Sequence, residues 1–269
     1  MPAIITIANQ KGGVGKTTTT ISVGHGLAQR GYRTLLVDVD PRANLPIALD
    51  CPKGKGIYYT LTKGCQNDSE IEFIASQVKS TGRERLSYLP SNVETVRAQK
   101  KLESDHAPIS YLRDRMKIFT TDMDFIIVDT PSSIALLQAL AVWAADFVMI
   151  PTRMSYLSNK GVANLLDDLR NIFRHKNWPG KLLGVLPSFY DHRTKATRTA
   201  MKELQDVFGG NVLPVVHRST AFENASREGL TVFEYANKHL SNPYAKRAVK
   251  EYVHITEAIL TAHSSEVNP

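Results

Sequence analysis

The chain has 269 residues, with 33 Lys and Arg against 26 Asp and Glu, and a formal net charge of +7 at pH 7. This length can bury a sizeable core, and no apolar run approaches the ~20 residues that a membrane-spanning helix needs. The sequence enters an apolar segment almost at once, so we expect no signal peptide. Cys51 and Cys65 lack metal-ligand spacing and suggest neither a disulfide framework nor a cluster. We therefore expect a cytoplasmic protein, for which the basic excess makes a polyanionic partner plausible.

Apolar, β-branched segments alternate with helical patterns along the chain. Buried strands are predicted for residues 4–8, 34–38, 86–89, 125–129, 147–151 and 182–186. Helices are predicted for residues 17–30, after the turn at residues 90–92, and for residues 161–173 and 243–262. This alternation indicates an α/β fold, a doubly wound, mostly parallel sheet with helices on both faces. We expect a single domain over residues 1–262 and a flexible tail at 263–269. Residues 50–82 look the least regular, with helical or hairpin content possible.

A glycine-rich turn joins the first predicted strand to the first predicted helix, with the sequence Gln10-Lys11-Gly12-Gly13-Val14-Gly15-Lys16-Thr17-Thr18. Glycines let backbone N–H groups converge on phosphate oxygens, and the helix N-terminus adds partial positive charge. Lys16 would reach the β and γ phosphates of a nucleoside triphosphate, and the Thr17 hydroxyl would hold Mg²⁺. The alternative, a glycine-rich hairpin that binds nothing, is disfavoured by the strand–loop–helix context. The candidate phosphate-binding residues are Lys11, Gly12, Gly13, Val14, Gly15, Lys16, Thr17 and Thr18.

This loop departs from the common pattern G-x-x-x-x-G-K-[ST], because Gln10 replaces the first glycine and Lys11 stands beside it. Lys16 already serves the triphosphate of its own chain, so Lys11 could reach the phosphates of a facing copy. The sequence here resembles the deviant Walker A P-loop NTPases, the group that holds the ParA partition proteins and the MinD cell-division proteins. The resemblance implies ATP and Mg²⁺ as ligands and an ATP-bound sandwich homodimer. It also implies a catalytic role for Lys11, which crosses that dimer, and for Lys16.

Two predicted strands end in carboxylates. Asp129 ends the strand at residues 125–129, the Walker B arrangement, and would lie beside Mg²⁺. Asp38 and Asp40 lie on one side of an extended segment. The resembled family carries D-x-D-P-Q-G-N here, which implies that Asp40 positions the attacking water and that Asp38 supports the Mg²⁺ shell. A helix cap for Asp129 and a surface turn at Asp40 are the alternatives. Arg42-Ala43 replaces the family's Gln-Gly, which leaves the details of this switch I segment open.

Three further segments match ParA sequences in order and spacing: residues 129–133 (switch II), 145–152 and 184–194. The resemblance therefore covers the chain from Ile4 to about Ile259 and is weak between Cys51 and Arg85. It suggests adenine contacts near residues 187–190 and 215–217.

The second half of the chain is basic, with ten Lys or Arg against six Asp or Glu between Asp191 and Lys250. Read with the ParA resemblance, this favours salt-dependent contacts to DNA phosphates without base readout. For any single residue a solvated surface charge is at least as good an explanation. The candidate DNA-binding residues are Arg193, Arg198, Arg218, Arg227, Lys246, Arg247 and Lys250. No helix-turn-helix extension precedes Met1, so sequence-specific repression is not expected.

The sequence lacks the motifs that competing functions require. An iron–sulfur reductase needs cysteines after the Walker B strand, a GTPase needs N-K-x-D where this chain has Asn237-Lys238-His239-Leu240, and an autokinase needs a C-terminal tyrosine cluster. A MinD-like membrane-cycling ATPase remains the alternative, although the last predicted helix ends without a basic cluster or large apolar anchors. We expect a cytoplasmic, nucleoid-associated ATPase that positions a plasmid, a chromosome origin or a protein organelle such as the carboxysome. A ParB-like adaptor on the cargo would stimulate hydrolysis.

Overall fold

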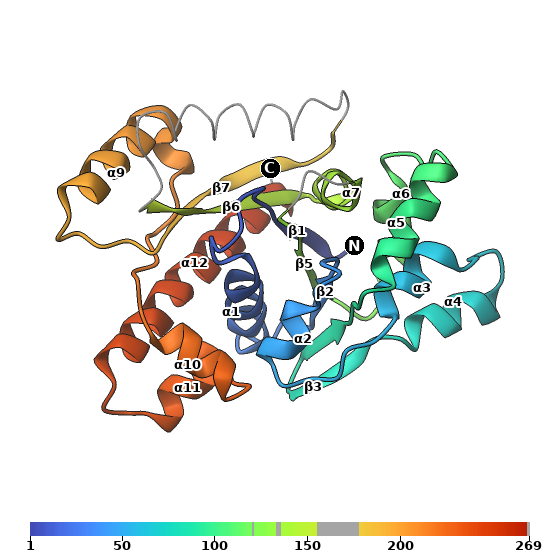
Figure 1. Ribbon diagram of the computed structural model, residues 1–269, viewed down its shortest axis with the longest axis horizontal. Helices are drawn as coiled ribbons and strands as arrows, with labels where there is room; N and C mark the ends of the chain where they lie inside the picture. Colours follow the sequence, from blue (N-terminus) through green and yellow to red (C-terminus); the bar gives the residue numbers. More distant parts are fainter. Residues whose placement is uncertain (120, 133–135, 155–177, 268–269) are drawn as a thin grey trace.

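The computed structural model describes residues 1–119, 121–132, 136–154 and 178–267 (Figure 1). Their strands form one sheet in the order β3-β4-β2-β5-β1-β6-β7. Every neighbouring pair is parallel except β3 with β4. The strands are β1 (Ala3–Ile7), β2 (Thr34–Asp38), β3 (Lys79–Arg83), β4 (Leu86–Leu89), β5 (Phe125–Asp129), β6 (Phe147–Arg153) and β7 (Lys181–Ser188). This confirms the predicted doubly wound, mostly parallel α/β fold.

Helices cover both faces of the sheet (Figure 1). Ile5, Ile7 and Ile127 pack on one face against α1 (Lys16–Ala28) and α12 (Pro243–Val267). Ile126 and Val128 point to the other face, as β-strand alternation requires. That second face is covered by α3 (Gly56–Thr62), α4 (Asp68–Ala75), α5 (Thr95–Ser104), α6 (Tyr111–Met116) and α7 (Leu136–Ala144), with α9 (Lys195–Phe208) over β6 and β7. The short helices α2 (Asn44–Ala48), α10 (Ala221–Arg227) and α11 (Val232–Lys238) complete the α1 side.

Helix α1 is the central element of the first face, since it contacts the sheet, α11 and α12. It is buried almost along its whole length. A Cβ at Gly24 would collide with the side chain of Leu36 on β2, so this glycine permits the close approach of helix and strand. The apolar packing holds the N-terminus of α1 at the carboxyl edge of β1, where ligands bind in open α/β sheets.

Most predicted elements are present, and the differences have physical reasons. The polar strand β3 and the helices α3 and α4 fall in the segment that looked least regular. The helices α10 and α11 were not predicted, because seven-residue helices give short patterns. Helix α12 continues to Val267, past the predicted end at Ala262, so the helix extends into the segment expected to be a tail. The predicted helix at 161–173 lies outside the described residues. Among those described, no helix combines the length and apolarity that crossing a membrane requires.

Candidate nucleotide site

The glycine-rich loop takes the backbone conformation that its sequence permits. Gly13 and Gly15 have φ angles of 68° and 94°, in the left-handed region, and Gly15 is the N-cap of α1. No side chain caps this helix, so its first backbone N–H groups have no side-chain acceptor. A phosphate oxygen placed there could accept from them and would meet the positive end of the helix dipole.

Lys16 is held inside this loop, with its side chain pointing back across the turn. Its ammonium donates to three oxygens: the carbonyls of Asn9 (3.0 Å) and Lys11 (3.2 Å) and the hydroxyl of Ser132 (2.9 Å). Burial lowers the pKa of Lys16, while the charges of Asp129 and Asp40 oppose that effect. An anion bound beside this buried ammonium would therefore stabilise its protonated form and raise its pKa.

A pair of buried carboxylates lies beside Thr17. Asp38 and Asp129 are register partners at the ends of β2 and β5, and both are essentially inaccessible. Thr17 donates its hydroxyl to Asp129 (2.7 Å). Asp38 accepts the N–H of Asp40 with one oxygen (2.9 Å), while its Oδ2 has no partner among the described residues. A buried carboxylate oxygen without a partner is costly unless a cation or proton is supplied.

These residues fit a magnesium ion. Burial raises the pKa of Asp129 to about 7, with the charge of Asp40 adding to the effect. Burial, followed by the charge of Asp129, raises the pKa of Asp38 well above its usual range. The Thr17 hydroxyl and carboxylate oxygens are ligands that Mg²⁺ prefers. Asp38, Asp129 and Thr17 could therefore hold it, directly or through water, next to a bound triphosphate.

We expect the metal-free protein to lose stability as pH rises from about 4 to about 7. The folded-state pKa of Asp129 lies above its ordinary value, so the folded protein binds a proton more tightly in this window. Stability is then highest below it and falls as the proton leaves, by roughly 4 kcal/mol at most. Thermal unfolding in EDTA at pH 5 and pH 8 measures this. Asp38→Asn keeps the acceptor for the Asp40 N–H, removes one charge, and should reduce the difference. A rise in stability over the same range would contradict the expectation.

Asp40 is paired within its own loop. Its carboxylate accepts the Arg42 N–H at 3.0 Å and two guanidinium nitrogens, Nε at 3.1 Å and Nη2 at 2.8 Å. The Ser91 hydroxyl donates to the Asp40 carbonyl (2.7 Å), which ties the segment to the end of β4. Ala43 takes a left-handed φ of 55°. The backbone turn that glycine would make without strain is thus retained with alanine.

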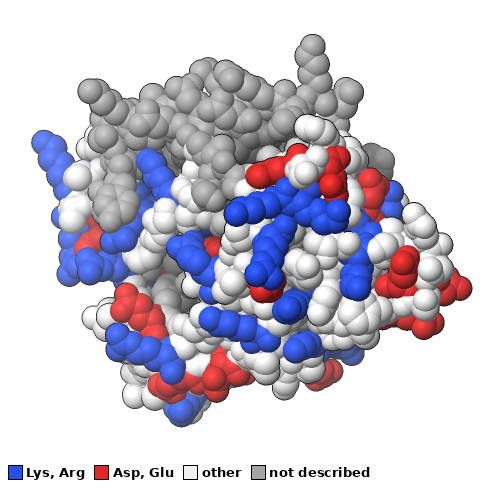
Figure 2. Space-filling model, turned by 45° about the vertical axis from the view of Figure 1, so that its right-hand side comes forward, with Lys and Arg blue, Asp and Glu red and all other residues white. Residues whose placement is uncertain are grey.

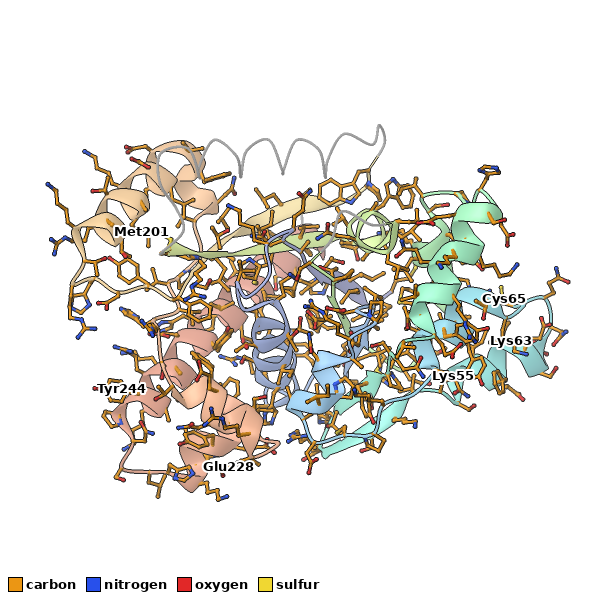
Figure 3. The ribbon with its side chains drawn as sticks, in the orientation of Figure 1. Lys55, Lys63, Cys65, Met201, Glu228 and Tyr244 are labelled. Carbon is orange, nitrogen blue, oxygen red and sulfur yellow. The ribbon has the colours of Figure 1, made fainter. Side chains whose placement is uncertain are left out.

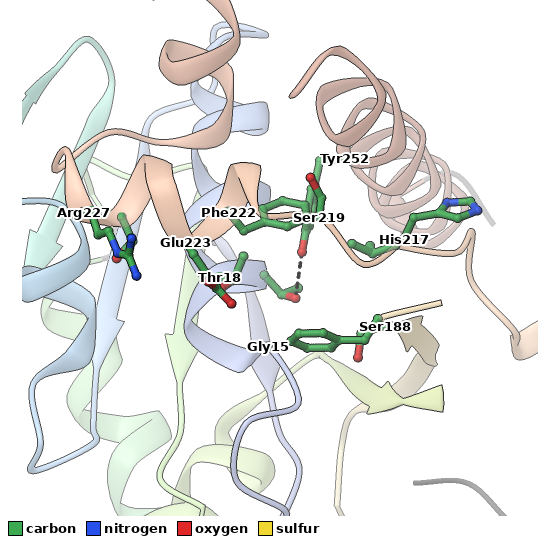
Figure 4. A pocket seen from close by; sticks show the side chains of 13 residues that line it. Gly15, Thr18, Ser188, His217, Ser219, Phe222, Glu223, Arg227 and Tyr252 are labelled. Atoms are coloured by element: carbon green, nitrogen blue, oxygen red, sulfur yellow. Dashed lines mark hydrogen bonds between the residues drawn. The ribbon is translucent and has the colours of Figure 1, made fainter. Parts of the chain in front are cut away.

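Two clefts of about 380 Å³ each open onto the loop and share Gly15, Thr18, Phe189 and Ser226. The first is lined by Lys16, Thr17, Asp40 and Arg42. The second is more apolar, and Figure 4 shows Phe222 and Tyr252 on one side of it and Gly15 and Ser188 on the other. Its wall includes Ser188, Phe189, Val216 and His217, from the segments predicted to contact adenine. The two clefts together could take a phosphate chain and a base.

Lys11 differs from Lys16 in orientation. Its backbone is fixed, since its N–H donates to the Asn9 side chain (2.9 Å) and its carbonyl accepts from Lys16. The residue is exposed, and its ammonium has no hydrogen bond or ion pair with the described residues. A fixed backbone with an outward ammonium is suited to contact a second molecule.

The predicted DNA-binding residues divide into groups. Arg218, Lys246 and Lys250 are exposed, and Arg247 links two of these segments by donating to the Arg218 carbonyl (3.4 Å). Arg247 also pairs with Glu251 at 3.5 Å.

The remaining candidates lie elsewhere. Arg193 pairs with Asp191 (2.7 Å) and Arg198 donates to the His192 carbonyl (3.2 Å), both near the start of α9. Arg227 lines the second cleft instead, beside Glu223 and Ser226.

Sequence reasoning missed three side chains that shape the site. Asn9 and Ser132 bind the loop lysines, and Arg42 covers Asp40. Ser132 lies in the segment matched to switch II, so the resemblance could have indicated that it lies near the phosphate loop. The contact from Arg42 to Ser132 (3.2 Å) joins residues 90 apart, and no local pattern could have shown it.

Comparisons with known proteins agree with this geometry. A family profile described as an AAA domain matches residues 2–179. The chain is 32% identical over 238 residues to the sporulation initiation inhibitor protein Soj of Bacillus subtilis, covering 87% of this chain and 92% of Soj. It is 32% identical over 213 residues to the chromosome partitioning protein ParA of Myxococcus xanthus, covering 79% and 74%. A Mycobacterium smegmatis structure described as cobyrinic acid a,c-diamide synthase, with a bound ATP analog and magnesium, aligns with a TM-score of 0.77 at 26% identity, covering 97% and 94%.

Proposed function

The chain belongs to the ParA/MinD-type partition ATPases, and on that premise we propose that it dimerises on ATP, binds DNA without sequence preference and positions an intracellular cargo. The observation that carries this proposal is the exposed Lys11 ammonium, which stands on a fixed backbone beside a complete phosphate loop. A second copy facing the loop would receive this lysine at its own triphosphate. ATP would thereby become part of the dimer interface.

Hydrolysis follows from the same residues. The loop N–H groups and Lys16 hold the phosphates, and Thr17, Asp38 and Asp129 would hold Mg²⁺, which would offset the phosphate charge. Asp40 orients a water in line with the terminal phosphorus. The bond from that phosphorus to the β-phosphate oxygen breaks as the bond to the water oxygen forms. The partner's Lys11 neutralises charge on the phosphoryl group in the transition state. Turnover removes the terminal phosphate from the interface, so hydrolysis dissolves the dimer.

DNA binding is proposed for the exposed basic residues at the start of α12, with Arg218 beside them. Dimerisation doubles this surface, and because phosphate contacts add, the affinity for DNA rises steeply when ATP joins two copies. Basic residues also occur elsewhere. The face shown in Figure 2 carries Lys and Arg interspersed with Asp and Glu, and Lys53 and Lys55 are exposed. The distribution of charge therefore does not identify the DNA-binding surface, and the following experiment is designed to identify it.

We expect Lys246→Ala/Lys250→Ala to weaken ATP-dependent binding to a random-sequence DNA duplex by tenfold or more. The logarithmic salt slope should fall by about 1 for each lysine lost. Lys53→Ala/Lys55→Ala removes the same charge from another part of the molecule, since Lys55 and the α12 residue Tyr244 lie on opposite sides (Figure 3). Binding is measured by fluorescence anisotropy with ATP, ADP or no nucleotide, over a range of salt concentrations.

The two double variants should behave differently, and equal losses would reject α12 as the DNA surface. Anionic liposomes are tested in parallel with the wild-type protein. Binding to liposomes without binding to DNA would replace this proposal with the membrane-cycling type of positioning ATPase.

An adaptor on the cargo, which would stimulate hydrolysis locally, completes the proposed cycle.

A further inference from the structure

Arg42 lies in the phosphate cleft, in the place where the resembled sequences carry glutamine. Its side chain reaches out of the switch I segment and lines the cleft together with Lys16 and Thr17. About 60% of the Arg42 side chain is exposed, whereas the Asp40 side chain beneath it is only 5% exposed. A largely exposed cation thus covers a buried carboxylate at the edge of the candidate phosphate site.

The local pairing of Arg42 has an internal comparison in this chain. Asp191 and Arg193 repeat the Asp-x-Arg spacing with the same donors, since Arg193 gives its backbone N–H, Nε and Nη2 to the carboxylate. That pair lies outside the clefts. The ring of hydrogen bonds is therefore a local preference of this spacing, and on its own it indicates no function.

A tertiary contact distinguishes Arg42 from Arg193. The Arg42 Nη2 donates to the Ser132 hydroxyl (3.2 Å), and Lys16 donates to the same hydroxyl (2.9 Å). Two cationic groups from different segments converge on one oxygen at the mouth of the glycine-rich loop. Lys16 is the residue expected at the β and γ phosphates, so the oxygen shared by the two cations marks the region of the terminal phosphate.

We infer that Arg42 is a phosphate-binding residue in cis, whose guanidinium turns from Asp40 to the terminal phosphate when ATP binds. Two effects follow from the exchange. The terminal phosphate gains a forked, charge-assisted contact that ADP cannot make. Asp40, with both oxygens occupied by Arg42 in the present structure, is released to orient water. The inference rests on the proposed nucleotide binding and names a residue that distinguishes ATP from ADP.

The test compares the affinities for ATPγS and ADP, each with Mg²⁺, by isothermal titration calorimetry. Arg42→Gln should lower affinity for ATPγS about tenfold or more, with ADP affinity changed less than about threefold; tenfold corresponds to roughly 1.4 kcal/mol. Arg42→Lys keeps the charge without the fork and should recover part of the difference. Arg97→Gln removes an exposed arginine of α5 that pairs with Glu94 and should change neither affinity.

Each other outcome rejects the inference. Equal losses for both nucleotides would assign Arg42 a structural role, and unchanged affinities would leave it a surface residue. A gain in ATPγS affinity would show that the Asp40 pair is the preferred state of the arginine. A wild-type protein that binds neither nucleotide would instead reject the proposed function itself, so the two failures are distinguishable.

Discussion

A Lys11→Ala variant is expected to bind ATP as a monomer and to lose hydrolysis by about 10³-fold or more. The magnitude is that of a cationic group supplied in trans to a phosphoryl group. The Lys11 ammonium makes no hydrogen bond or ion pair with the described residues of its own chain, while the Lys11 carbonyl and N–H shape the loop. Alanine preserves those backbone bonds, so nucleotide binding within one chain should survive. Light scattering on a size-exclusion column, with ATPγS and with ADP, measures the oligomeric state, and phosphate release measures the rate.

The matched control is Lys195→Ala, which removes an exposed lysine at the first residue of α9, away from both clefts. It should dimerise and hydrolyse ATP as the wild type does. A Lys11→Ala protein that still dimerises with ATPγS would remove the basis for the sandwich. A Lys16→Ala protein should behave differently again, with nucleotide binding itself lost, because this ammonium lies inside the loop.

An Asp40→Ala variant is expected to bind ATP, to hydrolyse it 10²- to 10⁴-fold more slowly, and to accumulate as a dimer. This range is the contribution of a well-placed general base. The loss of the carboxylate leaves Arg42 without its ion pair, but that side chain is largely exposed and its charge can be solvated. ATP binding should not weaken, since Asp40 repels phosphate and the freed guanidinium attracts it. Phosphate release, nucleotide affinity and light scattering are measured on the same preparation.

The control for Asp40→Ala is the same substitution at the second Asp-x-Arg pair of this chain. Asp191→Ala breaks the second Asp-x-Arg pair, at the same spacing and with the same donors. Because Asp191 lines neither cleft, hydrolysis measured without DNA should be unchanged. If Asp40→Ala hydrolysed ATP at the wild-type rate, the attacking water would have to be positioned by another group. The prediction for a trapped dimer would then fail as well.

The contiguous parts of the site could be read from the residues alone. The strand before the loop, its glycines and Lys16-Thr17 lie within fifteen residues, and their chemistry depends on local backbone geometry. The two acidic strand ends were equally visible, since apolar runs ended by a carboxylate need only the rule that parallel strands end on one edge. The register of Asp38 with Asp129 agrees with that rule.

Other features had no local signal. Strand β3, with the sequence Lys79-Ser-Thr-Gly-Arg83, lacks the apolar alternation that marks a strand, and it forms because β4 offers an edge. The base-sized cleft assembles from α1, α10, α12 and the end of β7, elements distant in the chain. The family resemblance suggested only the segments 187–190 and 215–217 for this cleft, whereas its walls from α10 and α12 come from how these helices pack.

The amino-acid sequence by itself therefore determined the fold class and indicated the candidate phosphate loop and the acidic residues around it, because short-range patterns and strand ends carry that information. Tertiary structure alone decided which residues share an oxygen or a cleft. It brings Arg42 to the Ser132 hydroxyl that Lys16 also binds, and it leaves Lys11 exposed. The physical reason is that a hydrogen bond or a charge acts over a few ångströms in space, and only folding brings segments 90 residues apart to that distance.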